Sequence, residues 1–80
     1  MTLAESREGQ VLVVKNLAAG FGARRRLFNL GILPGERLTV LKSAAFGGPV
    51  LVEVRGTEVA LGRGVARKIE VEDVRGGSDL

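Results

Sequence analysis

Three consecutive arginines, Arg24-Arg25-Arg26, are the residues of this chain whose type and spacing most clearly suggest chemistry. At about 100° per residue, three adjacent guanidinium groups on a helix spread over more than half of its circumference. A guanidinium group can bind a carboxylate or a phosphate through two parallel hydrogen bonds. The run therefore indicates binding to an acidic partner. The alternative is an ordinary solvated helix face, because arginine is also a good helix former.

Two phenylalanines extend this candidate binding surface. Phe28 lies about 100° round the predicted helix from Leu27, on the flank shared with Arg24. Because aromatic residues and arginine are enriched at the energetic centres of protein interfaces, we predict that Arg24, Arg25 and Phe28 contact a partner. The alternative is that Phe28 packs over the edge of the domain. Phe46, in a glycine-rich loop, is the next candidate for a partner contact.

Groups for catalysis and metal binding are scarce. The sequence contains no His and no Cys, so the commonest general base and the usual transition-metal ligands are missing. The serines have no such base beside them. We interpret the acidic group Glu70, Glu72 and Asp73 as a solvated strand end, the alternative being a weak cation site. We therefore expect no enzymatic activity, no catalytic residue, no cofactor and no metal site.

Alternating apolar residues predict the elements that position these groups. Five runs have the two-residue period of half-buried strands: 10–17, 36–42, 50–55, 58–61 and 68–74. Residues 23–30 lack this alternation and predict a short helix between the first two strands, with Ala23, Leu27 and Leu30 facing the core. Five short strands in 80 residues favour a small all-β barrel with one inserted helix.

Glycine and proline residues mark the connections. The sequence Leu33-Pro34-Gly35-Glu36 predicts a type II turn with a positive φ at Gly35. Gly31 is placed to end the helix in the left-handed conformation. A hairpin is expected at 55–58 and a single helical turn at 62–67, while the glycines of 20–22 and 62–64 are interpreted as turn residues rather than phosphate loops. The predicted structural turn residues are Gly31, Pro34, Gly35, Gly47, Gly48 and Pro49.

Composition and charge limit the function classes. The chain carries 12 basic and 9 acidic residues, a net charge of +3, which fits either an arginine-rich surface or attraction to an acidic partner. Nucleic acid is an unlikely partner, because three Phe and no Tyr or Trp leave few rings for base stacking. Without Cys, a signal-like N-terminus or a bilayer-length apolar run, we expect a cytoplasmic protein that does not insert into membranes.

One domain is expected over residues 1–74, followed by a disordered C-terminal tail over 75–80. An exposed strand at the edge of the predicted barrel also allows weak homo-oligomer formation.

A combination of short motifs resembles the ferrous iron transport protein A (FeoA) family. The motifs are LGILPGERLTV at 30–40, FGGPV at 46–50, GTEVAL at 56–61 and ARKIEV at 66–71. Each is weak alone, but their combination at these spacings is specific, and the resemblance covers about residues 3–73. Ala45 departs from the pattern, since many members carry proline there.

The resemblance implies an SH3-like barrel that serves transition metal ion homeostasis as a small cytoplasmic accessory protein. Its expected partner is the cytoplasmic part of FeoB, the membrane ferrous-iron transporter with a GTP-binding domain, whose activity it would modulate. A related domain forms the C-terminal part of iron-dependent repressors. A regulatory peptide-binding module is therefore one alternative. A basic SH3-like module that binds nucleic acid, favoured by Arg24-Arg25-Arg26 and the net positive charge, is the other.

Overall fold

The computed structural model describes residues 1–43 and 47–74 of the chain. It contains all five predicted strands and the predicted helix, with ends that differ by one or two residues. The strands are β1 (Val11–Leu17), β2 (Arg37–Ser43), β3 (Val50–Val54), β4 (Thr57–Leu61) and β5 (Ile69–Asp73). The helical elements are η1 (Leu3–Glu5), α1 (Phe21–Asn29) and α2 (Arg63–Ala66). The predicted loop residue Phe46 and the predicted tail over 75–80 lie outside the described residues.

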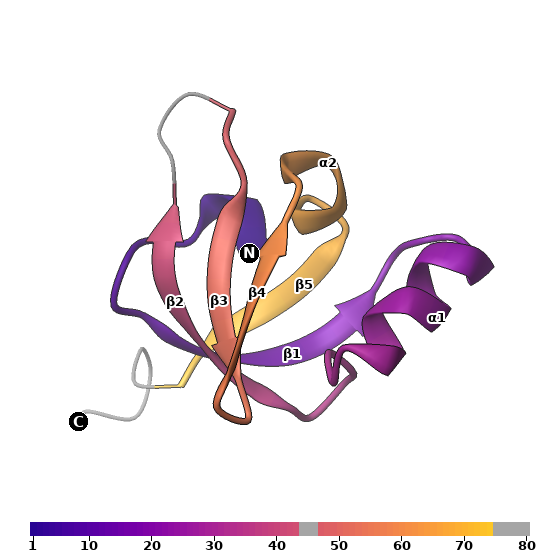
Figure 1. Ribbon diagram of the computed structural model, residues 1–80, viewed down its shortest axis with the longest axis horizontal. Helices are drawn as coiled ribbons and strands as arrows, with labels where there is room; N and C mark the ends of the chain where they lie inside the picture. Colours follow the sequence, from indigo (N-terminus) through magenta and orange to yellow (C-terminus); the bar gives the residue numbers. More distant parts are fainter. Residues whose placement is uncertain (44–46, 75–80) are drawn as a thin grey trace.

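The five strands form one antiparallel sheet in the order β4-β3-β2-β1-β5. Irregularities in register between Val14 and Asn16, and between Val40 and Lys42, interrupt the ladders of β1 and β2. Such irregularities bend strands and increase their twist. The sheet curls accordingly into a small SH3-like barrel, in which α2 joins the two edge strands β4 and β5 (Figure 1). The predicted fold class is confirmed.

The core lies on the concave side of the curled sheet and follows the predicted alternation. Val50, Val52 and Val54 are at most 2% exposed, while Glu53 between them faces solvent. The other buried apolar residues of the strands are Leu12, Val14, Leu17, Leu38, Val40, Val59, Leu61, Ile69 and Val71.

An N-terminal segment that the strand pattern did not predict completes this core. Leu3 in η1 is fully buried, and Thr2 forms a bridge to Glu70 of β5. The Thr2 amide donates to Oε1 of Glu5 at 2.7 Å, half of a capping box whose T-x-x-E signature is present in the sequence. The N-terminus therefore belongs to the folded domain.

The C-terminus of α1 corrects one predicted core residue. Leu27 is buried as expected, but Leu30 is 40% exposed, and Ile32 takes the core position instead. The helix ends at Asn29, and Gly31 adopts a left-handed φ of 88° that turns the chain back. The Ile32 amide donates to the Leu27 carbonyl at 2.8 Å and the Gly31 amide to the Phe28 carbonyl at 3.0 Å, which is the Schellman arrangement.

The turn after α1 forms as predicted. Gly35 has a φ of 94°, and the Glu36 amide donates to the Leu33 carbonyl at 3.0 Å. The Gly35 amide in turn donates to the Val14 carbonyl of β1 at 2.8 Å. This second bond fixes the turn, and with it Leu33 and Pro34, against the middle of β1. The hairpin between β3 and β4 is also confirmed, with positive φ values at Arg55 and Gly56.

Arg63, at the start of α2, connects three parts of the chain. Its Nη1 donates to the carbonyl of Ala4 at 2.7 Å, and its Nε donates to the carbonyl of Gly48 at 3.2 Å. The guanidinium group therefore holds η1, the loop before β3 and α2 together. The glycines on either side of Arg63 act as helix-turn residues here, as predicted.

Candidate functional site

Helix α1 has two chemically different faces. Leu27 points into the core, and Ala23 beside it is half-buried. The opposite face carries Phe21, Arg24, Arg25 and Phe28, whose positions i, i+3, i+4 and i+7 lie on one stripe of a helix. The rings of this stripe are not covered by the domain: Phe21 is 82% exposed and Phe28 is 61% exposed.

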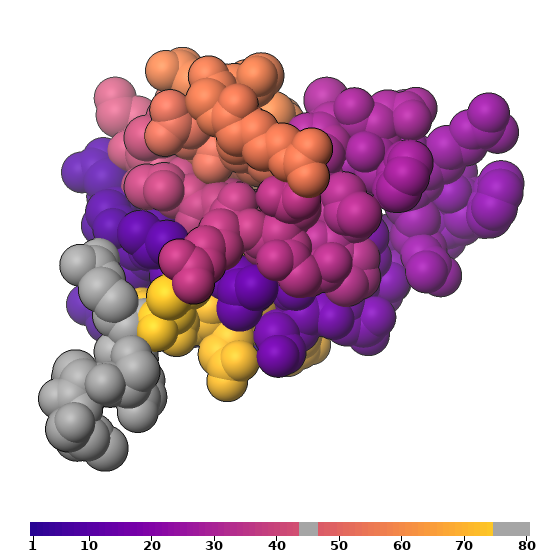
Figure 2. Space-filling view, turned by 90° about the horizontal axis from the view of Figure 1, so that it is seen from below, coloured from indigo at the N-terminus to yellow at the C-terminus, as the bar shows by residue number. Residues whose placement is uncertain are grey.

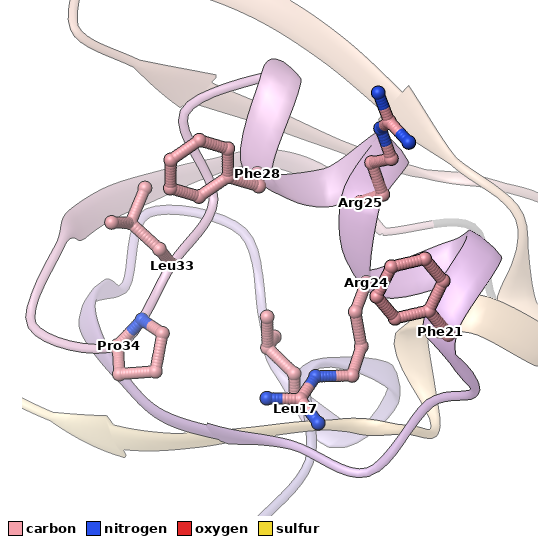
Figure 3. A pocket seen from close by; sticks show the side chains of 7 residues that line it. All are labelled: Leu17, Phe21, Arg24, Arg25, Phe28, Leu33 and Pro34. Carbon is pink, nitrogen blue, oxygen red and sulfur yellow. The ribbon is translucent and has the colours of Figure 1, made fainter.

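A hollow of about 470 Å³ lies between this stripe and the neighbouring chain. We call it the α1 groove; it is lined by Leu17, Phe21, Arg24, Arg25, Phe28, Leu33 and Pro34. Figure 3 shows Phe28 beside Leu33 and Pro34 at one end and Phe21 at the other. Arg24 extends across the groove towards Leu17, whereas the guanidinium group of Arg25 points away from it.

Local sequence explains why these residues converge. Gly20 is the N-cap of α1, so the helix begins at Phe21. This start places Phe21 on the same exposed stripe of the helix as Arg24, Arg25 and Phe28. Leu17 is the last residue of β1 and only 7% exposed, which gives the groove an apolar floor. The glycine-dependent turns at Gly31 and Gly35 then return the chain so that Leu33 and Pro34 form the opposite wall.

The groove lies in the most basic part of the chain. Residues 10–35 contain four basic residues and no Asp or Glu. Within residues 1–43 and 47–74, the ion pairs involve other groups: Lys15 with Glu72, Arg55 with Glu36, and the N-terminal amine with Glu70. The hydrogen bond and the negative charge of Glu36 raise the pKa of Arg55.

The α1 region also protrudes from the body of the domain. Figure 2 shows its purple side chains projecting at one end of the molecule, beyond the packed strands. A partner can therefore reach the stripe without displacing another element of the fold.

The structure brings together three of the four predicted contact residues. Arg24, Arg25 and Phe28 line one groove, while Phe46 lies outside the described residues. Phe28 does not pack under the barrel edge, since most of its ring is exposed. Phe21 was missed, because its flanking glycines were interpreted as a turn. The spacing of seven residues between Phe21 and Phe28 is the helical signal that identifies it.

The acidic residues of β5 are occupied by interactions within the domain. Glu72 pairs with Lys15 at 3.5 Å, and Asp73 accepts a hydrogen bond from Nε2 of Gln10 at 2.8 Å. In the described part of the chain, no group of three or more His, Cys, Asp or Glu residues is placed to hold a metal ion. The same residues include no helix that is long and apolar enough to cross a membrane.

A family model, a curated protein and a solved structure all relate this chain to FeoA proteins. Residues 1–73 match the family model of the FeoA domain. The chain is 42% identical over 77 residues to a curated protein of Methanocaldococcus jannaschii named as an Fe(2+) transport protein A, covering 96% of this chain and 92% of that protein. The solution structure of a FeoA protein from Chlorobium tepidum superposes with a TM-score of 0.87 at 34% identity, covering 99% of this chain and 75% of that one.

Some structural neighbours are metal-dependent regulators. A manganese-dependent transcriptional repressor contains a similar domain, with a TM-score of 0.84 and 28% identity. The match covers 92% of this chain but only 41% of the repressor. A similar domain therefore makes up most of the Chlorobium tepidum FeoA protein and a smaller part of a longer regulator.

Proposed function

The chain belongs to the FeoA family, which is associated with ferrous iron transport, and from this premise we propose that it binds the cytoplasmic part of a FeoB-type membrane transporter and modulates its activity. In this proposal the chain is an accessory protein that performs no chemistry of its own. Transport and nucleotide turnover are carried out by the transporter.

The α1 groove is the observation that carries the proposal. Phe21 and Phe28 leave large apolar surfaces in water on either side of Arg24, and none of the described acidic side chains pairs with this arginine. Burying such rings against a partner removes apolar surface from water, which favours the complex. Aromatic and arginine side chains in one hollow are also the composition of an interface hot spot.

The residue inventory supports an accessory role. Fe²⁺ in proteins is commonly held by imidazole, thiolate or clustered carboxylates, and the sequence has no His and no Cys. A protein of this composition contributes to iron transport through a macromolecule that holds the iron. The FeoB-type transporter is such a partner.

The test is a calorimetric titration of the purified chain with the detergent-solubilised transporter of the same organism. Arg25→Glu should weaken the association by about 1.5–3 kcal/mol, the range for a lost hydrogen bond to a charged group. Arg7→Glu is the matched control, because Arg7 is also exposed and lies before β1, at the opposite end of that strand from the groove residue Leu17. Absence of binding by the wild-type chain would refute the proposal, and equal weakening by both variants would remove the contact from α1.

A regulatory peptide-binding module is the second candidate, favoured by the domain shared with the manganese-dependent repressor. A basic module for nucleic acid is a further alternative, favoured by the arginine run. If the chain binds nucleic acid through its arginines, the logarithm of the binding constant for DNA falls linearly with the logarithm of salt concentration, because binding releases counterions from the phosphates. A titration with duplex DNA at several salt concentrations separates it from protein binding.

A further inference from the structure

The shape of the α1 groove restricts what can fill it. Its volume of about 470 Å³ lies within the range of roughly 300–1,000 Å³ typical of ligand pockets. Small-molecule pockets, however, enclose most of their ligand. Here the end walls, Phe21 and Phe28, are themselves largely exposed, so an occupant confined to the hollow leaves the outer faces of both rings in water. A polypeptide segment that enters the groove and continues over the rings covers both surfaces.

The floor of the groove selects an apolar side chain. Leu17, Leu33 and Pro34 present carbon atoms to the hollow, and their side chains have no hydrogen-bond donor or acceptor. A polar group inserted over these three side chains would lose hydrogen bonds to water, and the guanidinium group of Arg24, which reaches towards Leu17, could replace them only for an acceptor. One leucine-like or phenylalanine-like anchor suits this floor better.

The rim of the groove selects negative charge. Arg24 crosses the hollow and Arg25 lies at its edge, no Asp or Glu is among the lining residues, and none of the ion pairs among the described residues involves either arginine. A second copy of this chain, related by two-fold symmetry, would bring arginines against arginines. A flanking Asp or Glu would instead form charge-assisted hydrogen bonds with the guanidinium groups.

We propose that the α1 groove binds a short acidic segment of the partner protein, which inserts one apolar side chain between Phe21 and Phe28, pairs one flanking carboxylate with Arg24 inside the groove, and places the other against the outward-pointing guanidinium group of Arg25 at its edge. This inference rests on the proposed function, because it assigns the recognition chemistry to the same surface. It adds a sequence rule for the partner: an apolar anchor with acidic residues on both sides and no basic residue.

Designed peptides test this rule without knowledge of the natural partner. The first probe is a short fluorescein-labelled peptide with a central leucine flanked on each side by glutamates. A second probe carries lysines in place of the glutamates, and a third carries serine in place of the leucine. Fluorescence anisotropy should show saturable binding of the first probe and at least about tenfold weaker binding of the other two, the loss that removal of one charge-assisted hydrogen bond or one buried anchor produces.

Matched variants locate the binding. Arg24→Glu and Phe28→Ala should each weaken binding of the first probe at least about tenfold. The controls Arg7→Glu and Leu30→Ala should leave it unchanged, since Arg7 is an exposed arginine before β1, Leu30 is an exposed apolar residue, and neither lines the groove. Each variant must keep the circular dichroism spectrum of the wild type. Equal binding of all three probes, no saturation, or equal effects of groove and control variants would overturn the inference.

The remaining occupants are distinguished in the same assay. Displacement of the first probe by a thymidine oligonucleotide, or concentration-dependent dimerisation that Phe28→Ala abolishes, would replace the acidic segment by nucleic acid or by a second copy. The results also distinguish a failure of the proposed function from a failure of the groove inference. If the probes follow the rule but the transporter does not bind, only the proposed function fails. If the transporter binds and neither groove variants nor probes affect it, only the groove inference fails.

Discussion

Substitution of Gly31 by alanine should destabilise the domain through the backbone alone. Gly31 has a φ of 88° at the C-terminus of α1, where the chain turns from the helix towards the buried Ile32. A residue with a Cβ in this conformation costs about 1–2 kcal/mol. The added Cβ would lie 3.4 Å from Cγ1 of Val54, which is close to an ordinary contact, so packing adds little.

Gly22→Ala is the matched control, because it makes the same chemical change in the first turn of the same helix. A Cβ at Gly22 meets no atom within 4 Å, and its φ is in the ordinary range. Alanine in a helix is favoured over glycine by roughly 0.5–1 kcal/mol. The two substitutions, Gly22→Ala and Gly31→Ala, should therefore change stability in opposite directions.

Thermal denaturation measures the difference. For a domain of this size about 1 kcal/mol shifts Tm by roughly 4–8 °C. Gly31→Ala should lower Tm by about 4–16 °C and Gly22→Ala should raise it by about 2–8 °C. Gly31→Asn should fall between Gly31→Ala and the wild type, because asparagine tolerates the left-handed conformation better. An unchanged Tm for Gly31→Ala would refute the left-handed helix end and the position of the groove wall that depends on it.

Further predictions concern core, surface and metal. Leu27→Ala should lower the free energy of unfolding by about 2–5 kcal/mol, because Leu27 is buried. Phe28→Ala should change it by less than about 1 kcal/mol, because Phe28 is exposed. Equal losses of stability in urea denaturation would contradict a helix with one buried and one exposed face. Arg63→Ala should lower the free energy of unfolding by about 1.5–3 kcal/mol in the same assay, because it removes charge-assisted hydrogen bonds to the carbonyls of Ala4 and Gly48. Unchanged stability would show that these hydrogen bonds are not needed for the fold. Anaerobic calorimetry with Fe²⁺ should reveal no stoichiometric site of micromolar or tighter affinity, and such a site would contradict the accessory role.

The sheet was predictable because each strand buries one face. Alternation at Val50, Val52 and Val54 requires no knowledge of the neighbouring strands, and glycine at positions such as Gly35 marks where the chain must turn. The identity of the core residue after α1 was not predictable from helical periodicity. Periodicity continues to Leu30, but the left-handed residue at Gly31 ends the helix and gives the core position to Ile32.

The candidate site was predictable only in part, for a related reason. Arg24, Arg25 and Phe28 follow from the exposed face of a helix, but the helix was expected to begin at Ala23. Two glycines around Phe21 favour a turn in isolation, and tertiary packing of Leu27 and Ile32 overrides that preference. The apolar floor could not be predicted from local patterns. Leu17 ends β1, whereas Leu33 and Pro34 lie in the turn after α1, so only the folded chain brings them together.

Hydrogen–deuterium exchange of the chain in complex with the purified transporter in detergent micelles tests the central claim most directly. Amides of residues 20–34 span α1 and the wall of the α1 groove, so they should exchange more slowly in the complex than in the free protein. Residues 57–61 of the edge strand β4 should exchange at the same rate in both states. Protection of β4 with no change in residues 20–34 would contradict the claim that the partner binds through α1.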